Sequence, residues 1–198
     1  MSEQSTMETP SQIDPTLPAE YSEPVSLSAW ALLIAVGGAV IALDQYAKWL
    51  VASKLVLGQS WEPIPAIAGF LRVTYSRNIG AAFGLMPQFG DTYLLLSLTT
   101  VVALVVSYPR LSSAARLIRV AIAMIAGGAL SNAVDRILLG YVVDYAHIQL
   151  GPGFSNISNF ADHAITLGVT LLILDQWLAE RRETQIQDDG TPEGTDAV

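Results

Sequence analysis

Two aspartates lie beside long apolar stretches of the chain, where an ionised side chain carries a large free-energy cost. Asp144 follows Gly-Tyr-Val-Val at residues 140–143, and Asp162 follows Asn-Phe-Ala at residues 159–161, with no Lys or Arg between the two aspartates. Two carboxylates close together share one proton near neutral pH, because ionising both is unfavourable. One of them can then take a proton from water while the other donates a proton to a carbonyl, which is the chemistry of aspartic proteases.

The same two carboxylates allow other interpretations. They could form a proton relay in a small carrier or channel, or they could be unrelated groups, with Asp162 placed at the positive end of a helix dipole. A relay needs ionisable groups through the whole membrane, whereas only Asp175 lies towards the inner side. A purely structural membrane protein would not explain the Asn and Asp residues near the helix ends.

Two further polar groups are spaced to share helix faces. Asp44 and Lys48 stand four residues apart, which is typical of a salt bridge near the membrane surface or of a polar post that orients loops or substrate. Asn132, Asp135 and Arg136 also share one face, where Arg136 could pair with Asp135 or meet anionic headgroups. The glycines at residues 127–128, a turn below, would allow close helix packing.

The sequence lacks the residues that several other kinds of catalytic or binding site require. The chain has no Cys, which excludes a disulfide, a thiol nucleophile and a Cys metal site. Its two His residues form no zinc-binding pattern, and no serine-hydrolase or nucleotide-binding motif occurs. We therefore expect no metal, no organic cofactor and no nucleic-acid partner.

The composition is that of a polytopic membrane protein, because 52% of the 198 residues are hydrophobic and 14% are charged. The net charge of −8 comes from the ends. Residues 1–24 and 183–198 each carry five acids and no Lys or Arg, so the ends contribute −10 and residues 25–182 carry +2. We expect disordered, acidic, cytoplasmic tails at 1–24 and 183–198, and a membrane domain at 25–182.

Four apolar stretches predict helices that cross the membrane, each near the length of roughly 20 residues that a span requires. The first is expected to be retained, since residues 1–24 lack the basic start of a signal peptide. Five Arg residues follow the second and fourth stretches, against three basic residues in the other loops, which places both tails in the cytoplasm. Asp44, Asp135, Asp144 and Asp162 then all lie at the outer face. The predicted spans are residues 27–50, 92–108, 117–137 and 161–178.

About 40 residues outside the membrane are expected between the first two spans. Residues 70–75 alternate apolar and polar side chains, which predicts a strand. We expect a small sheet, or cradle, within residues 58–90, resting on the bilayer surface, and a loop at 150–158. The predicted fold is therefore an all-α membrane protein with four transmembrane helices and a small extramembrane β-sheet between the first and second helices.

Five motifs in this order resemble those of the lipoprotein signal peptidases, or signal peptidase II, the four-helix membrane aspartic proteases of bacteria. The resemblance covers about residues 27–180, and the long acidic tails exceed the compact form of the family. Two positions depart from the family pattern. Ser158 stands where a Phe is usual, and His163 stands where a small residue is frequent, which bears on fine specificity and not on the reaction. The motifs are residues 44–48, 78–84, 127–136, 140–145 and 159–162.

The resemblance implies a function and a set of residue roles. The substrate would be a prolipoprotein with diacylglycerol on a Cys, cut before that Cys at the outer face of the bacterial cytoplasmic membrane. The enzyme would act as a monomer in contact with membrane lipid. Asp144 and Asp162 would be the catalytic dyad. The residues that would bind substrate or brace the site are Asn78, Gly80, Asn132, Arg136, Asn159, Ala161, Asp44, Lys48 and Asp135.

Overall fold

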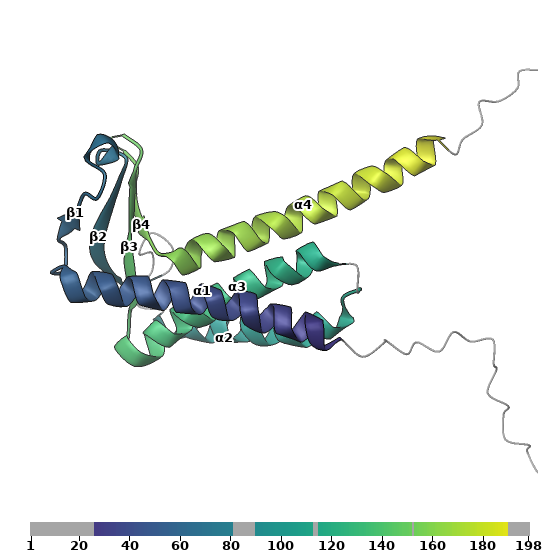
Figure 1. Ribbon diagram of the computed structural model, residues 1–198, viewed down its shortest axis with the longest axis horizontal. Coiled ribbons are helices and arrows are strands. Elements are labelled where there is room, and N and C mark those ends of the chain that lie inside the picture. Colours follow the sequence, from purple (N-terminus) through teal and green to yellow (C-terminus); the bar gives the residue numbers. More distant parts are fainter. Residues whose placement is uncertain (1–25, 81–89, 113–114, 152, 190–198) are drawn as a thin grey trace, which may run out of the picture.

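Four long helices and a four-stranded antiparallel sheet make up the computed structural model, which describes residues 26–80, 90–112, 115–151 and 153–189 (Figure 1). The part of the second motif at residues 81–84 and the predicted tail at 1–24 lie outside the described residues. The helices are α1 (Leu27–Lys54), α2 (Gly90–Ser107), α3 (Arg116–Leu139) and α4 (Phe160–Asp189), and the strands are β1 (Ser60–Trp61), β2 (Leu71–Asn78), β3 (Val142–Gln149) and β4 (Ser155–Ser158). Two short 3-10 helices, η1 (Pro65–Ile67) and η4 (Tyr108–Arg110), join them.

The helices agree with the apolar stretches of the sequence. Within the described residues, α1, the segment Asp91–Arg110 and α3 are long and apolar enough to cross a membrane. These three coincide with the first three predicted spans. The fourth predicted span lies inside α4, which continues as helix to Asp189. The first residues of the tail predicted at 183–198 are therefore helical.

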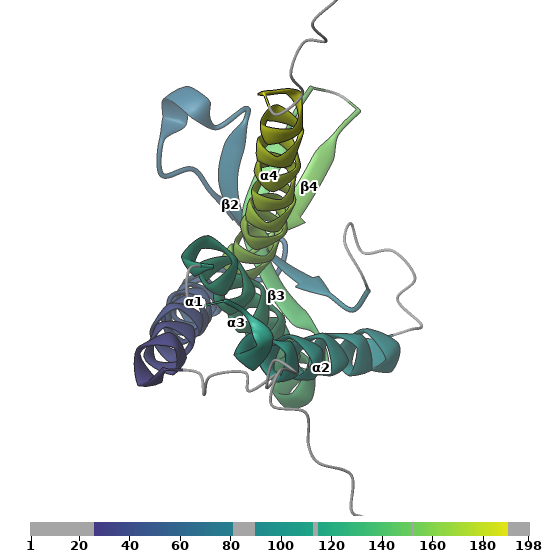
Figure 2. The same ribbon diagram turned by 90° about the vertical axis from the view of Figure 1, so that its right-hand side faces the viewer.

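Helix α3 lies at the centre and packs against α1, α2 and α4 (Figure 2). A side chain at Gly127 would meet the Gly37 carbonyl oxygen of α1 at 2.7 Å, and one at Gly128 would meet the Ala161 carbonyl oxygen of α4 at 2.6 Å. Both distances are too short for a Cβ atom, so glycine is required where these backbones meet. The predicted role of the glycine pair is confirmed, and its effect is to hold the start of α4 against α3.

The sheet stands at the end of the helices where α1 and α3 finish and α4 begins (Figure 1). Its strand order is β1-β2-β3-β4, and all neighbouring pairs are antiparallel. The register of β2 and β3 shifts between Val73 and Ser76, and beyond this irregularity Ser76 pairs with Asp144 and Asn78 with Val142. The end of β2 thus lies beside the aspartate of β3.

The expectation that the sheet lies within residues 58–90 is wrong, because half of its strands follow α3. The predicted loop at 150–158 is also wrong in part, since Ser155–Ser158 form β4 and pair with β3. A four-residue strand of Ser, Asn, Ile and Ser carries almost no alternation of apolar side chains. Its conformation is set by backbone hydrogen bonds to β3, which a local pattern does not reveal.

A single glycine makes the turn from α3 to β3. Gly140 caps α3 with φ of 79°, in the left-handed region, and its N–H donates to the Arg136 carbonyl oxygen at 3.0 Å. Glycine reaches this conformation without the strain that a Cβ atom brings. The chain can therefore reverse direction sharply and place Asp144 next to the end of the helix it has just left.

Candidate active site

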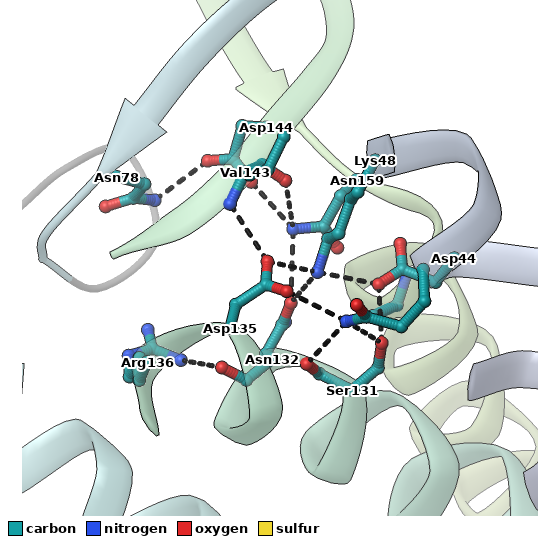
Figure 3. Close-up of polar contacts among 12 residues, drawn as sticks. Asp44, Lys48, Asn78, Ser131, Asn132, Asp135, Arg136, Val143, Asp144 and Asn159 are labelled. Carbon is teal, nitrogen blue, oxygen red and sulfur yellow. Dashed lines mark hydrogen bonds and ion pairs between the residues drawn. The ribbon is translucent and has the colours of Figure 1, made fainter. Parts of the chain in front are cut away.

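Lys48 of α1 lies buried between two carboxylates. Its Nζ atom is 2.6 Å from Asp44 Oδ2 and 2.9 Å from Asp135 Oδ2, and it donates a hydrogen bond to Asn132 Oδ1 at 2.8 Å (Figure 3). All four residues are buried. The predicted pairing of Asp44 with Lys48 is confirmed. Of the interpretations open for Arg136, pairing with Asp135 is not the one that the structure shows, because Lys48 of α1 pairs with Asp135.

The two carboxylates of this cluster also hold the backbone of the elements that follow. Asp44 accepts hydrogen bonds from the Ser131 hydroxyl at 2.7 Å and from the Ala161 N–H at 3.0 Å. Asp135 accepts the Val143 N–H at 3.0 Å. Charge-assisted bonds of this kind are stronger than neutral ones. The ion cluster therefore fixes the start of α4 and the start of β3 relative to α1 and α3.

Two asparagines connect the ion cluster to the predicted catalytic aspartates. The Asn159 side chain donates from Nδ2 to Asp144 Oδ1 at 2.7 Å and to Asn132 Oδ1 at 3.2 Å. The Asn132 side chain donates from Nδ2 to Asp162 Oδ1 at 2.8 Å. Asp144 and Asp162 are therefore joined through two buried amides, and the Lys48 contact to Asn132 orients the second of these amides.

The residues around Asp162 also cap α4. The Asp162 N–H donates to Asn159 Oδ1 at 2.9 Å, and Asp162 Oδ2 accepts the Asn159 N–H at 3.4 Å. This reciprocal arrangement satisfies two backbone groups that a helix start leaves without partners. Asp162 therefore does cap the start of α4, through its oxygen Oδ2. Its other oxygen, Oδ1, accepts the hydrogen bond from Asn132.

The end of β2 also contributes to the site, through Asn78. Asn78 donates from Nδ2 to Asp144 Oδ2 at 3.0 Å, and its Oδ1 accepts the Gly80 N–H at 2.9 Å. Arg136 donates to the Gly80 carbonyl oxygen at 3.2 Å and to the Asn132 carbonyl oxygen at 3.4 Å. With these contacts, all of the residues predicted for the site belong to one connected network.

Asp144 and Asp162 line the same cavity, whose volume is about 380 Å³. Asn78, Asn132 and Arg136 line it with them, so the polar groups of the network face the space in which a substrate could lie. The other lining residues come from the strands and from α4, and they are Val142, Asn156, Ile157, Ser158, His163, Ile165 and Thr166.

The environment of Asp144 changes its acidity. The carboxyl is only 2% exposed, and burial together with the charge of Asp162 raises its pKa from 3.8 to about 7, against the opposing effect of the hydrogen bonds from Asn78 and Asn159. Near neutral pH the Asp144 carboxyl therefore exchanges between its protonated and ionised forms. A carboxyl of this kind can donate a proton at the pH at which a neighbouring carboxylate accepts one.

Sequence reasoning missed two residues that support the site. Gln45 donates from Nε2 to Asp135 Oδ1 at 2.8 Å and to the Ser131 carbonyl oxygen at 3.1 Å. The Tyr145 hydroxyl accepts the Phe160 N–H at 3.2 Å, and burial raises the pKa of Tyr145 to about 12, so the side chain stays neutral. Their positions in the sequence could have indicated this role, because Gln45 directly follows Asp44 and Tyr145 directly follows Asp144.

The described residues contain no group of three or more His, Asp or Glu side chains arranged to hold a metal ion. Asp44 and Asp135 converge on Lys48, whose ammonium group supplies the positive charge between them.

Residues 36–178 match the family model described as signal peptidase (SPase) II. The chain is 37% identical over 149 residues to a lipoprotein signal peptidase of Anoxybacillus flavithermus, covering 75% of this chain and 87% of the relative. It is 39% identical over 143 residues to that of Halothermothrix orenii, covering 72% of this chain and 92% of the relative.

Two solved structures share the fold. Both are described as bacterial membrane enzymes solved by the in meso method, at 2.3 Å and 1.9 Å resolution. The first has a TM-score of 0.67 at 28% identity and covers 85% of this chain and 95% of its own. The second has a TM-score of 0.66 at 32% identity and covers 74% of this chain and 92% of its own.

Proposed function

The chain belongs to the signal peptidase II family, and we propose that it removes signal peptides from prolipoproteins by cutting before a diacylglyceryl-modified Cys. It is a bacterial multi-pass membrane protein and a peptidase. One observation carries the assignment of the site. Asp144 and Asp162 line one cavity and are joined through Asn132 and Asn159.

In the proposed mechanism, Asp162 is ionised and Asp144 is protonated when the substrate binds. Asp162 takes a proton from water, the water oxygen attacks the carbonyl carbon of the scissile bond, and Asp144 protonates the carbonyl oxygen. The tetrahedral intermediate then collapses as Asp162 gives its proton to the leaving amine and Asp144 recovers a proton from a hydroxyl group. Both carboxyl groups return to their starting forms. The raised pKa of Asp144 supports its role as the proton donor.

The remaining residues of the network orient this pair. Asn78 and Asn159 each donate to a different oxygen of Asp144, so these two hydrogen bonds fix the plane of that carboxyl group. Asn132 does the same for one oxygen of Asp162 and is itself held by Lys48. Precise orientation of reacting groups contributes strongly to catalysis. The buried ion cluster is therefore proposed to position the dyad and not to take part in the reaction.

We also propose that α4 is a fourth span and that the catalytic end of the helices lies at the outer face. Its 30 residues extend about 45 Å, which exceeds a hydrocarbon core of about 30 Å. Arg181 and Arg182 lie near its far end. Arg110 lies in η4, and Arg116 and Arg119 lie in the first turn of α3, at the ends of α2 and α3 away from the dyad. This distribution supports cytoplasmic tails. A lipid-bearing substrate would then reach a monomeric enzyme by lateral diffusion.

The proposal is tested by cleavage of a defined substrate in detergent. The purified chain is expected to cut a diacylglyceryl-modified prolipoprotein and to leave the same substrate with an unmodified Cys intact. Asp144→Asn and Asp162→Asn should each lower the rate by at least about 10²-fold, the lower end of the usual contribution of a general acid or base. Asp175→Asn, on α4 but outside the cavity lining, is the matched control and should keep full activity. A folded chain that cuts neither substrate would contradict the proposed reaction, and full activity in either dyad variant would contradict the dyad.

A further inference from the structure

The two positions that depart from the family pattern contact each other. Ser158 Oγ lies 3.2 Å from His163 Nε2, across the junction between β4 and α4. Both residues line the cavity that contains Asp144 and Asp162. Ser158 is buried, with 6% of its surface exposed, whereas His163 is exposed. The two departures therefore form one polar pair at the edge of the candidate active site.

The junction explains how the pair forms. β4 ends at Ser158 and α4 begins at Phe160, so the first turn of the helix brings residue 163 back over the end of the strand. Between them, Asn159 directs its side chain to Asp144. A Phe at position 158 would fill this place with an apolar ring and would offer the imidazole no hydrogen bond.

The imidazole has a second ring nitrogen beyond its contact with Ser158. The Ser158 hydroxyl shares a hydrogen bond of 3.2 Å with His163 Nε2, in which either group can donate, and it also lies 3.5 Å from the Ala146 carbonyl oxygen. The other ring nitrogen, Nδ1, is an acceptor in one tautomer and a donor in the other, so it can bond a hydroxyl group in either form. Asn156 lines the same cavity, and an amide side chain can both donate and accept a hydrogen bond.

We propose that Ser158 and His163 are specificity-determining residues, which form a polar subsite for a hydroxyl-bearing substrate side chain close to the cleaved bond. This inference rests on the proposed function and deepens it. A subsite built from hydrogen-bonding groups discriminates against a side chain that leaves those groups without partners. The subsite should therefore favour Ser over Ala at one substrate position, while the dyad performs the same reaction on either substrate.

The test uses a set of diacylglyceryl-modified prolipoproteins that differ only by Ser or Ala at one position. The positions are the three residues before the modified Cys and the one residue after it. For the full chain in detergent, kcat/KM for Ser is expected to exceed that for Ala by roughly three- to tenfold at one of these positions, the effect of a single hydrogen bond.

Variants then assign the preference to the pair. His163→Ala and Ser158→Ala should each bring the Ser-to-Ala ratio close to one, and the double variant should change it no further, because the two side chains act as a unit. His163→Gln, which keeps a donor and an acceptor, should retain part of the preference. Thr170→Ala removes a side-chain hydroxyl from α4 away from the cavity lining, and it should leave the ratio unchanged.

The ratio of the two substrates, and not the absolute rate, separates recognition from a structural role. Equal slowing of both substrates in His163→Ala would mean that the pair only supports the fold, and it would overturn the inference. A wild-type enzyme that cuts lipidated substrates without a Ser preference at any position would also overturn it, and it would leave the proposed function intact. If the wild-type chain cuts no lipidated substrate, both proposals fall.

Discussion

Replacing Asp144 with Asn should change how the stability of the fold depends on pH. Burial and the charge of Asp162 raise the pKa of Asp144 from 3.8 to about 7. Between these two values the folded chain keeps a proton that the unfolded chain releases, so the free energy of unfolding falls as the pH rises. One pKa unit corresponds to about 1.36 kcal/mol, which gives a loss of roughly 4 kcal/mol by pH 8, of which less than about 1 kcal/mol has occurred by pH 4.

The substitution has a second effect that does not depend on pH. Asn159 and Asn78 each donate to a different oxygen of Asp144, at 2.7 Å and 3.0 Å. An amide has one oxygen, so one of these hydrogen bonds is lost, at a cost of about 1–3 kcal/mol. Asp144→Asn should therefore be less stable than the wild type at pH 4.5. By pH 8 it should match or exceed the wild type, because the variant has no charge to bury.

The assay is unfolding of the purified chain in a mild detergent, followed by far-ultraviolet circular dichroism between pH 4.5 and pH 8. Glu62→Gln, which neutralises an exposed carboxyl in the same way, is the control and should follow the wild-type curve. Parallel curves for the wild type and Asp144→Asn across this range would refute the reasoning, since they would mean that the Asp144 carboxyl titrates alike in the folded and unfolded chains.

Three more predictions concern the proton, the ion cluster and the helix contact. The value of kcat/KM should fall above a pH of about 7 as Asp144 loses its proton, and a rate that stays constant to pH 9 would exclude Asp144 as the donor. Lys48→Met leaves two buried carboxylates without their counter-charge and should lower the unfolding free energy by about 3–5 kcal/mol, whereas a loss below about 1 kcal/mol would contradict a structural role for the cluster. Gly128→Ala places a Cβ atom 2.6 Å from the Ala161 carbonyl oxygen and should lower both activity and stability, the latter by about 1–3 kcal/mol. Gly69→Ala, where a Cβ atom meets nothing within 4 Å, should alter neither, and equal behaviour of the two glycine variants would contradict the packing argument.

The helical part of the fold could be predicted because its signal is local. A run of roughly 20 apolar residues has few alternatives to a membrane-crossing helix, since the backbone must satisfy its own hydrogen bonds in lipid. The sheet could be predicted only in part. Residues 70–75 carry an alternating pattern and lie almost wholly in β2, whereas β4 has no such pattern and exists because β3 offers it a partner. Strand pairing between distant segments is a tertiary property.

The candidate site, like the fold, could be predicted from the sequence only in part. Residue types and motif order were enough to name Asp144, Asp162 and the asparagines around them. The spacing of Asp44 and Lys48 predicted their contact correctly, because residues four apart meet on any helix. Spacing along one helix could not show that Asp135 pairs with Lys48 of α1, because these two residues are 87 positions apart in the sequence and meet only in the folded chain.

The sequence by itself determined the membrane class, the helices and the identity of the acidic residues, because these depend on composition and short-range spacing. Only the tertiary structure decided which groups line one cavity, which amides join the two aspartates and that Ser158 contacts His163. These properties arise where α1, β3 and α4 meet on α3. Burial and the approach of a second carboxylate set the acidity of Asp144, and neither exists before the chain has folded.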